Sequence, residues 1–380
     1  MMRIGIEAQR IFRKKRHGMD MVVIELIQQL QSLDKTNSYF VFVNEMEDPG
    51  IILETHNFKI IPLKKSSYPV WEQIHLPKAA EKYQIDILHC TSNTAPWSCR
   101  SKLVLTLHDI IYLEKIKFNA GTWYQRLGNL YRRWNVPGIV KKADMIFTVS
   151  HYEQKKIMAH FGLNENQVKV TYNGVSPHFK PVGNQVQLEI KNKYQLPESF
   201  MLFLGNTDPK KNLKGVLSAL QLLHESGSSF PDLVMPDFGE PVLRKMLNDI
   251  GAIALLAKIK LTGYIPNKDL PAIYAQAKLF LYPSLRESFG IPILEAMACG
   301  CPVITSNTSS MPEVAGDAAL LVDPFQPEQI KAAIEELLSS TEVRENWINK
   351  GFKRPPLFNY REGALKVMET YLEIYGHHDG

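Results

Sequence analysis

The fold is decided by the stretch LFLYPSLRESFGIPILEAMACGCPVIT, which occupies residues 279–305. An apolar run at 279–282 and a β-branched run at 302–305 enclose a loop and a short helical segment, so the stretch predicts strand, loop, helix and strand. Pro292 suits the first position of that helix, where an N–H would be unpaired anyway, and Gly300 suits its end. The helix start presents backbone N–H groups and a positive dipole end, which favour an anion and above all phosphate. Four residues stand there: Ser288, Phe289, Gly290 and Ile291.

Two glutamates bracket this predicted anion site, Glu287 in the loop and Glu295 in the first turns of the helix. Both lie at the carboxyl end of a strand, where open α/β sheets bind ligands. Carboxylates suit hydroxyl donors and not phosphate, so the combination describes a nucleotide sugar. The spacing alone also fits a glutamate that favours a helix N-terminus beside a solvated loop charge.

The longer string ESFGIPILEAMACGCPVITSNTSSMPEVAGDAALLVDP, residues 287–324, resembles the signature of the retaining GT-B glycosyltransferases of the group-1, or family-four, class. The resemblance covers nearly the whole chain and implies an α/β fold. That fold is GT-B, two Rossmann-like doubly wound domains that face a cleft, with a C-terminal helix crossing back to the first domain. We therefore predict an acceptor-side domain at 1–178 with the C-terminal helix 361–380, a linker region at 179–198 and a nucleotide-sugar-binding domain at 199–360.

The 380 residues are 45% hydrophobic and 22% charged, as in ordinary globular proteins, and suffice for two domains. No apolar run approaches the length of a membrane span and the first residues lack a signal-peptide core, so we expect a cytoplasmic protein. Four cysteines without a usual metal spacing fit a reducing compartment.

Charge is distributed unevenly along the chain. Residues 1–178 hold 24 Lys and Arg against 16 Asp and Glu, a net of +8, whereas the remainder has a net of −3. A basic first half suggests an anionic partner, and a merely solvated basic surface fits equally well.

Residues 122–142, TWYQRLGNLYRRWNVPGIVKK, mix aromatic with basic side chains. This mixture suits peripheral contact with the inner membrane face, while inward packing of the aromatic residues is the alternative.

Strand-like and helical runs alternate through the first half, which predicts a parallel, doubly wound sheet. The strand-like runs are 3–8, 39–43, 58–62, 87–90, 103–107, 145–149 and 168–172, and the helical ones include 19–33, 71–83, 124–140 and 151–161. The resemblance places Gly18, in a basic loop after the first run, toward the donor phosphates. It also implies that His108, at the tip of run 103–107, reaches the donor sugar. A histidine that only caps the strand fits the spacing equally.

A loop rich in polar residues, GNTDPKKN at 205–212, follows the first strand-like run of the second half. Lys210 and Lys211 precede a predicted helix at 213–224, so two ammonium groups there suit a diphosphate, although an exposed charge pair fits in isolation. The resemblance implies that this basic pair holds the donor diphosphate and places Asn206 where some members have Arg. It further assigns the turn at 261–266 to the nucleotide base, with Tyr264 and Ile265 in contact.

The sequence thus predicts transfer of a hexose, with mannose and glucose as candidates, from a UDP- or GDP-linked donor to a hydroxyl of a glycan or lipid-linked acceptor. The resemblance implies retention of configuration and a role in cell-surface polysaccharide synthesis. Glu287, His108 and Lys211 are the predicted catalytic residues, and Glu295 would bind the ribose. Because Asp-x-Asp is absent and lysines can replace a metal's charge, we expect no cofactor and no metal. No nucleic acid partner is indicated. The alternatives are a nucleotide-sugar 2-epimerase of the same architecture and a non-catalytic binding subunit.

Overall fold

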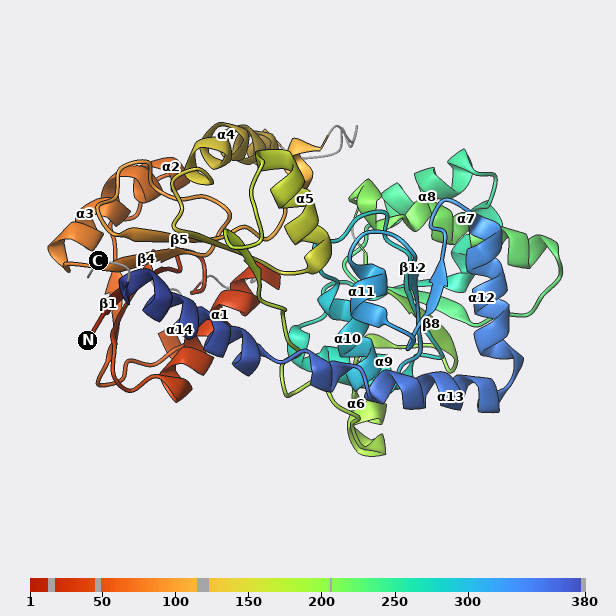
Figure 1. Ribbon diagram of the computed structural model, residues 1–380. Coiled ribbons are helices and arrows are strands. Elements are labelled where there is room, and N and C mark those ends of the chain that lie inside the picture. Colours follow the sequence, from red (N-terminus) through yellow and green to blue (C-terminus); the bar gives the residue numbers. More distant parts are fainter. Residues whose placement is uncertain (13–17, 45–48, 115–122, 206, 377–380) are drawn as a thin grey trace. The chain divides into compact units, whose positions relative to one another are not determined.

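The computed structural model describes residues 1–12, 18–44, 49–114, 123–205 and 207–376 (Figure 1). These residues form two compact units, each built on one parallel β-sheet. The described parts of 1–114, 123–173 and 359–376 make the first unit, and 174–358 make the second. The predicted pair of Rossmann-like domains is confirmed.

The sheet of the first unit has seven described strands in the order β3-β2-β1-β4-β5-β6-β7, all parallel. Its strands are β1 (Arg3–Glu7), β2 (Ser38–Val43), β3 (Phe58–Pro62), β4 (Ile87–Cys90), β5 (Lys102–Thr106), β6 (Met145–Thr148) and β7 (Val168–Val170). Its helices are α1 (Gly18–Leu33), α2 (Tyr68–Val70), the π-helical turn η2 (Trp71–His75), α3 (Leu76–Lys82), α4 (Trp123–Ile139), α5 (His151–Phe161) and α14 (Tyr360–Gly376). The strands are short apolar runs because helices cover both faces of the sheet.

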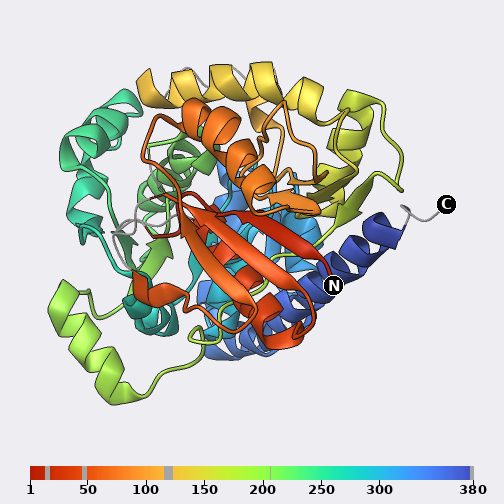
Figure 2. The same ribbon diagram turned by 90° about the vertical axis from the view of Figure 1, so that its left-hand side faces the viewer.

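The C-terminal helix α14 belongs to the first unit, as predicted. It packs against α1 on one face of the sheet, while α2, α3 and α4 lie over the other face (Figures 1 and 2). The hydroxyl of Tyr371 on α14 lies 2.6 Å from Nδ1 of the fully buried His89 on β4. Residues 377–380 of the predicted segment lie outside the described residues.

The sheet of the second unit has six described strands in the order β10-β9-β8-β11-β12-β13, again all parallel. They are β8 (Phe200–Phe203), β9 (Asp232–Met235), β10 (Ile259–Leu261), β11 (Phe280–Tyr282), β12 (Val303–Ser306) and β13 (Leu320–Val322). The helices are α6 (Asn184–Tyr194), α7 (Leu213–Glu225), α8 (Glu240–Asp249), α9 (Leu270–Gln276), α10 (Ile291–Ala298), α11 (Met311–Ala315), α12 (Pro327–Ser339) and α13 (Thr341–Phe352). The strand order reverses between β8 and β11, and ligands bind at such switch points.

Two segments differ from the prediction. The region 179–198, predicted as a linker, contains helix α6, which packs on α9 within the second unit, and that unit begins at 174. The run 71–83, predicted as one helix, is a π-helical turn followed by α3. Pro77 stands at the start of α3 and has no N–H to donate to the preceding turn, so a regular helix cannot run through it.

Candidate active site

Residues 283–290 form the central loop, which lies between β11 and α10 at the switch point of the second sheet. Gly290 precedes α10 with φ +107°, a backbone conformation that a side chain would strain. Helix α10 begins at Ile291, so Pro292 occupies the second helical position and not the first. The first-turn N–H groups have no partner within a helix, so proline fits either position. The predicted helix start is otherwise confirmed.

Lys211 and Glu287 are in direct contact. The Nζ atom of Lys211 lies 2.6 Å from Oε1 of Glu287, and their side chains are 18% and 12% exposed. Lys211 also donates a hydrogen bond of 2.9 Å to the hydroxyl of Tyr282, the last residue of β11, and its ammonium stands 4.8 Å from the centre of that ring. The structure therefore joins two of the predicted catalytic residues in one nearly buried ion pair.

Glu287 is held in its charged form by this environment. Burial raises the pKa of its carboxyl, but the positive charges of Lys211 and Lys210 outweigh burial, so the pKa lies below its usual value. A carboxylate is an acceptor only, which suits it to sugar hydroxyls.

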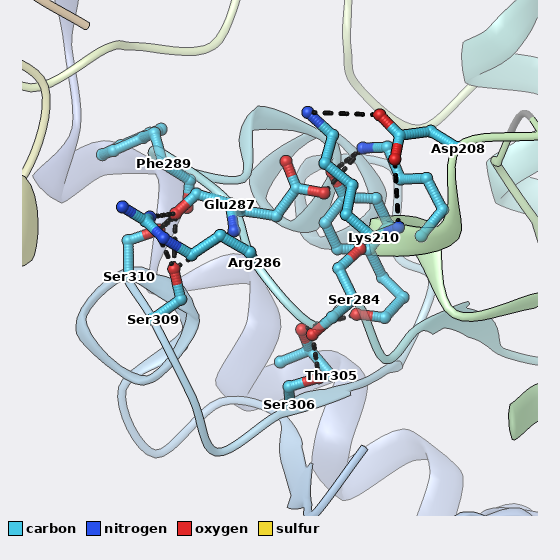
Figure 3. Close-up of polar contacts among 12 residues, drawn as sticks. Asp208, Lys210, Ser284, Arg286, Glu287, Phe289, Thr305, Ser306, Ser309 and Ser310 are labelled. Atoms are coloured by element: carbon cyan, nitrogen blue, oxygen red, sulfur yellow. Dashed lines mark hydrogen bonds and ion pairs between the residues drawn. The ribbon is translucent and has the colours of Figure 1, made fainter. Parts of the chain in front are cut away.

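Backbone contacts bring the lysines to the central loop. The carbonyl of Lys210 accepts the N–H of Leu285 at 2.7 Å, so the 3₁₀ turn η4 (Pro209–Lys211) is tied to the loop. Asn212, with φ +60°, caps α7 and donates to the carbonyls of Pro283 and Pro324 at 3.0 and 2.7 Å. The ammonium of Lys210 lies 3.8 Å from Asp208 (Figure 3). Two cations thus stand at the carboxyl edge of the sheet.

Glu295 lies in the second turn of α10, within the first turns of the helix as predicted. Its carboxyl accepts a 3.3 Å hydrogen bond from the hydroxyl of Tyr274. Burial raises the pKa of Glu295 to about 7, and the Tyr274 hydrogen bond offsets only part of that effect. Burial raises the pKa of Tyr282, and the negative charges of Glu287 and Glu295 raise this pKa further.

The remaining predicted donor-binding residues of the second unit lie in two places, after β10 and at the start of α10. Tyr264 and Ile265 follow β10, the edge strand, where Tyr264 is 55% exposed and Ile265 is buried. Phe289 is buried against Phe358, with ring centres 5.6 Å apart, so its contribution at the helix start is limited to its backbone. Asn206 lies outside the described residues.

His108 and Gly18 belong to the first unit. His108 is buried after β5, and its Nε2–H donates to the carbonyl of Thr91 at 3.0 Å, which leaves Nδ1 as an acceptor. Burial lowers the pKa of His108, so the ring is neutral. Gly18 is the first residue of α1, and a Cβ there would meet open space, so nothing in its packing requires glycine. The roles of both residues toward the donor stay predictions.

Four residues of the site were missed from the sequence: Tyr282, Arg286, Ser309 and Ser310. Arg286 is a charged residue within a buried loop, and Ser309 and Ser310 follow β12. The sequence shows that polar residues stand at these positions, but it does not show which groups they contact. Among the described residues, no group of three or more His, Cys, Asp and Glu side chains is placed to hold a metal ion. Metal independence stays a prediction.

The chain is similar to known glycosyltransferases in sequence and in structure. A family model described as "Glycosyl transferases group 1" matches residues 186–354, and one described as "Glycosyltransferase Family 4" matches residues 16–179. The chain is 32% identical to the O-antigen chain mannosyltransferase B of Escherichia coli, over 71% of this chain and 70% of that protein. The chain belongs to the group 1 glycosyltransferases.

The chain is also similar to other proteins, at lower sequence identity. The serotype-specific mannosyltransferase WbdA of Escherichia coli is 28% identical over 78% of this chain, but the match spans only 35% of WbdA. Among solved structures, a sucrose-phosphate synthase from Thermosynechococcus elongatus matches with a TM-score of 0.76 and 18% identity, over 99% of this chain and 100% of that one. Anabaena Alr3699/HepE in complex with UDP-glucose matches with a TM-score of 0.72 and 18% identity, over 98% and 100%. At such identities the likeness shows the fold, so the predicted GT-B architecture is confirmed, while its cleft stays a prediction.

Proposed function

We propose that this glycosyltransferase moves a hexose from a nucleoside diphosphate sugar to a hydroxyl of a glycan or lipid-linked acceptor, with retention of configuration. Mannose is the first candidate for this hexose. The observation that carries the proposal is the nearly buried Lys211–Glu287 pair beside the start of α10. The mannosyltransferase names of its relatives support the sugar and a role in cell-surface polysaccharide synthesis. The UDP-glucose bound by Alr3699/HepE supports a nucleotide sugar as donor.

The chemistry follows from where charge develops. As the bond between the anomeric carbon and the diphosphate breaks, the diphosphate gains negative charge and the sugar becomes oxocarbenium-like. Groups already positioned around the developing charge lower the barrier most, because they need no reorganisation during the reaction. Lys210, Lys211 and the backbone N–H groups at the start of α10 serve the diphosphate. The acceptor oxygen then forms its bond to the anomeric carbon, and its proton passes to an oxygen of the departing diphosphate, which leaves as the nucleoside diphosphate.

In this proposal the Lys211–Glu287 pair binds two parts of the donor, its diphosphate and its sugar. The ammonium of Lys211 has three N–H groups, and Glu287 and Tyr282 are its acceptors among the described residues. A further N–H can therefore bind a phosphate oxygen without breaking these contacts. Glu287 accepts from sugar hydroxyls with its remaining lone pairs, and Glu295 accepts from the ribose. Each residue is thus held in place before the donor arrives.

A thermal-shift screen of GDP-mannose, UDP-glucose and ADP-glucose tests the donor. A donor at one hundred times its dissociation constant stabilises the protein by about 2.7 kcal/mol. Failure of every nucleotide sugar to raise the melting temperature refutes the proposal. Analysis of the products without any acceptor separates transfer from epimerisation, because an epimerase converts the donor alone.

Peripheral membrane contact forms the second part of the proposal, and it rests on one face of α4. Leu127, Leu130 and Trp134 are 60%, 64% and 59% exposed, and their spacing places them on the same face of the helix. Tyr131, in contrast, points inward and donates a 2.5 Å hydrogen bond to Glu72. The stretch 122–142 has five Lys and Arg and no Asp or Glu, which favours an anionic lipid surface. None of the described helices is long and apolar enough to cross a membrane.

Vesicle sedimentation tests this contact. The protein should sediment with vesicles that contain phosphatidylglycerol and not with pure phosphatidylcholine. The double variant Leu127→Gln/Leu130→Gln should lose binding, whereas Leu188→Gln, a 57% exposed leucine on α6, serves as the matched control and should retain it. Equal binding by the double variant and the control would exclude the α4 face.

A further inference from the structure

Three side chains hold the backbone N–H and the backbone carbonyl of Glu287: Ser309 and Ser310, which follow β12, and the neighbouring Arg286. The hydroxyl of Ser309 donates to the carbonyl of Glu287 at 2.5 Å and accepts the N–H of the same residue at 3.1 Å (Figure 3). The hydroxyl of Ser310 lies 3.0 Å from that carbonyl and 2.9 Å from the carbonyl of Phe289. Arg286 donates from Nη1 to the Glu287 carbonyl at 2.9 Å and to the Ser309 hydroxyl at 3.1 Å.

These contacts saturate the groups involved. A hydroxyl has one donor and two acceptor sites, and Ser309 uses all three on Glu287 and Arg286. The carbonyl oxygen of Glu287 has two lone pairs and faces three donors. Arg286 is 4% exposed and Ser310 is fully buried, so water competes little with this network. The N–H and the carbonyl of Glu287 are therefore both held in place, although the residue lies in a loop.

Ser309 adopts a backbone conformation that serine rarely takes. Its φ of +60° lies in the left-handed region, which glycine occupies without strain and other residues occupy at a cost of about 1–3 kcal/mol. Strain of this kind persists where surrounding contacts over-determine the backbone, and it clusters at functional sites. The hydroxyl contacts with Glu287 are the feature that glycine would lack, so they account for serine at this position.

We propose that Ser309 is a positioning residue for sugar transfer, whose hydroxyl fixes the backbone of Glu287 and thereby the direction of its carboxylate. The inference rests on the proposed function, because it assumes that Glu287 binds the transferred sugar. In this backbone conformation of the loop the carboxylate stands 2.6 Å from the ammonium of Lys211. A displacement of about 1 Å in a positioned catalytic group can cost on the order of 100-fold in rate. The hydroxyl therefore acts on turnover and not on the affinity for the nucleotide.

Three variants test the inference. Ser309→Ala and Ser309→Gly both remove the hydroxyl, and the glycine variant also relieves the backbone strain. Ser306→Ala is the matched control, because the buried Ser306 hydroxyl donates to the carbonyl of Ser284 at 2.6 Å and makes no contact with Glu287 among the described residues. Turnover is followed as GDP release from GDP-mannose in the presence of acceptor, and affinity by titration with GDP.

Both Ser309 variants should lower kcat by about 10- to 100-fold, with the dissociation constant for GDP changed less than twofold. Ser309→Gly should be more stable than Ser309→Ala and still slow, which separates positioning from folding. Ser306→Ala should keep its kcat. Wild-type kcat in Ser309→Gly, or a loss of GDP affinity as large as the loss of kcat, overturns the inference. If Glu287→Gln also keeps wild-type kcat, the proposed role of Glu287 fails as well; if Glu287→Gln is slow and Ser309→Gly is not, only the positioning role fails.

Discussion

Replacement of Lys211 by alanine separates the stability of the site from its chemistry. The substitution leaves Glu287, whose side chain is 12% exposed, without its cation at 2.6 Å. Breaking a buried ion pair costs about 3–5 kcal/mol, and the partial exposure of this pair puts the cost near 3 kcal/mol. For a domain of 150–250 residues each kcal/mol lowers the melting temperature by about 2–4 °C. Lys211→Ala should therefore melt roughly 6–12 °C lower than wild type at pH 8.

The loss should depend on pH with a defined sign. In the wild type the pKa of Glu287 lies below its usual value, so the pair contributes stability above the ordinary carboxyl pKa and loses it as the pH falls through the folded value. Loss of Lys211 removes the largest of the effects that oppose burial, so the pKa of Glu287 is higher in the variant than in the wild type. The variant therefore takes up a proton on Glu287 at a higher pH than the wild type does, which removes the unpaired charge, so it should be closer to wild type at pH 5 than at pH 8.

The double variant Lys211→Ala/Glu287→Gln completes the test. It has no buried charge left unpaired, so it should recover much of the stability lost in Lys211→Ala while remaining inactive. Lys210→Ala is the control, because Lys210 is 29% exposed and 3.8 Å from Asp208, and exposed pairs contribute only about 0–1 kcal/mol. Differential scanning fluorimetry at both pH values, beside GDP release from GDP-mannose, provides the readouts. An equal melting loss at pH 5 and pH 8, or a double variant no more stable than Lys211→Ala, would show that the unpaired charge of Glu287 is not what destabilises Lys211→Ala.

Two further predictions concern pH and metal. The pKa of Glu295 is about 7, and its carboxylate is proposed to accept hydrogen bonds from the ribose. The GDP affinity of the wild type should therefore fall about tenfold more from pH 8 to pH 6 than the GDP affinity of Glu295→Gln does. Calorimetric titration that shows the same pH dependence in both proteins would contradict this prediction. Because Lys210 and Lys211 already stand where the diphosphate is expected, turnover should survive EDTA, and a loss that magnesium or manganese restores would show that a metal is required.

Local signals in the sequence predicted the central supersecondary unit. Gly300 and the proline at 292 bounded α10 within one or two residues, because both act on their own backbone. The linker prediction for 179–198 differed from the structure because α6 is mostly polar and short, so its helical packing on α9 depends on tertiary contact.

The chemistry of the site was only partly visible in the sequence. Glu287 and Lys211 were each predicted, but their contact joins residues 76 positions apart and depends on backbone bonds such as Leu285 to Lys210. The same holds for Ser309, whose left-handed backbone and bonds to Glu287 arise from the fold of two separate loops. Sequence patterns therefore predicted the groups, and long-range packing set their partners.

The two glutamates are proposed to have separate roles, Glu287 at the transferred sugar and Glu295 at the nucleotide. Calorimetric titration of Glu287→Gln and Glu295→Gln with GDP, beside their rates of transfer from GDP-mannose, distinguishes these roles. Glu295→Gln should weaken GDP binding by about 1.5–3 kcal/mol, the value of a charged hydrogen bond. Glu287→Gln should bind GDP as tightly as wild type or tighter, because Lys211 is then no longer neutralised, while its turnover falls by about 10²–10³-fold. A Glu287→Gln protein that loses GDP affinity as much as Glu295→Gln does would show that the two glutamates do not have separate roles.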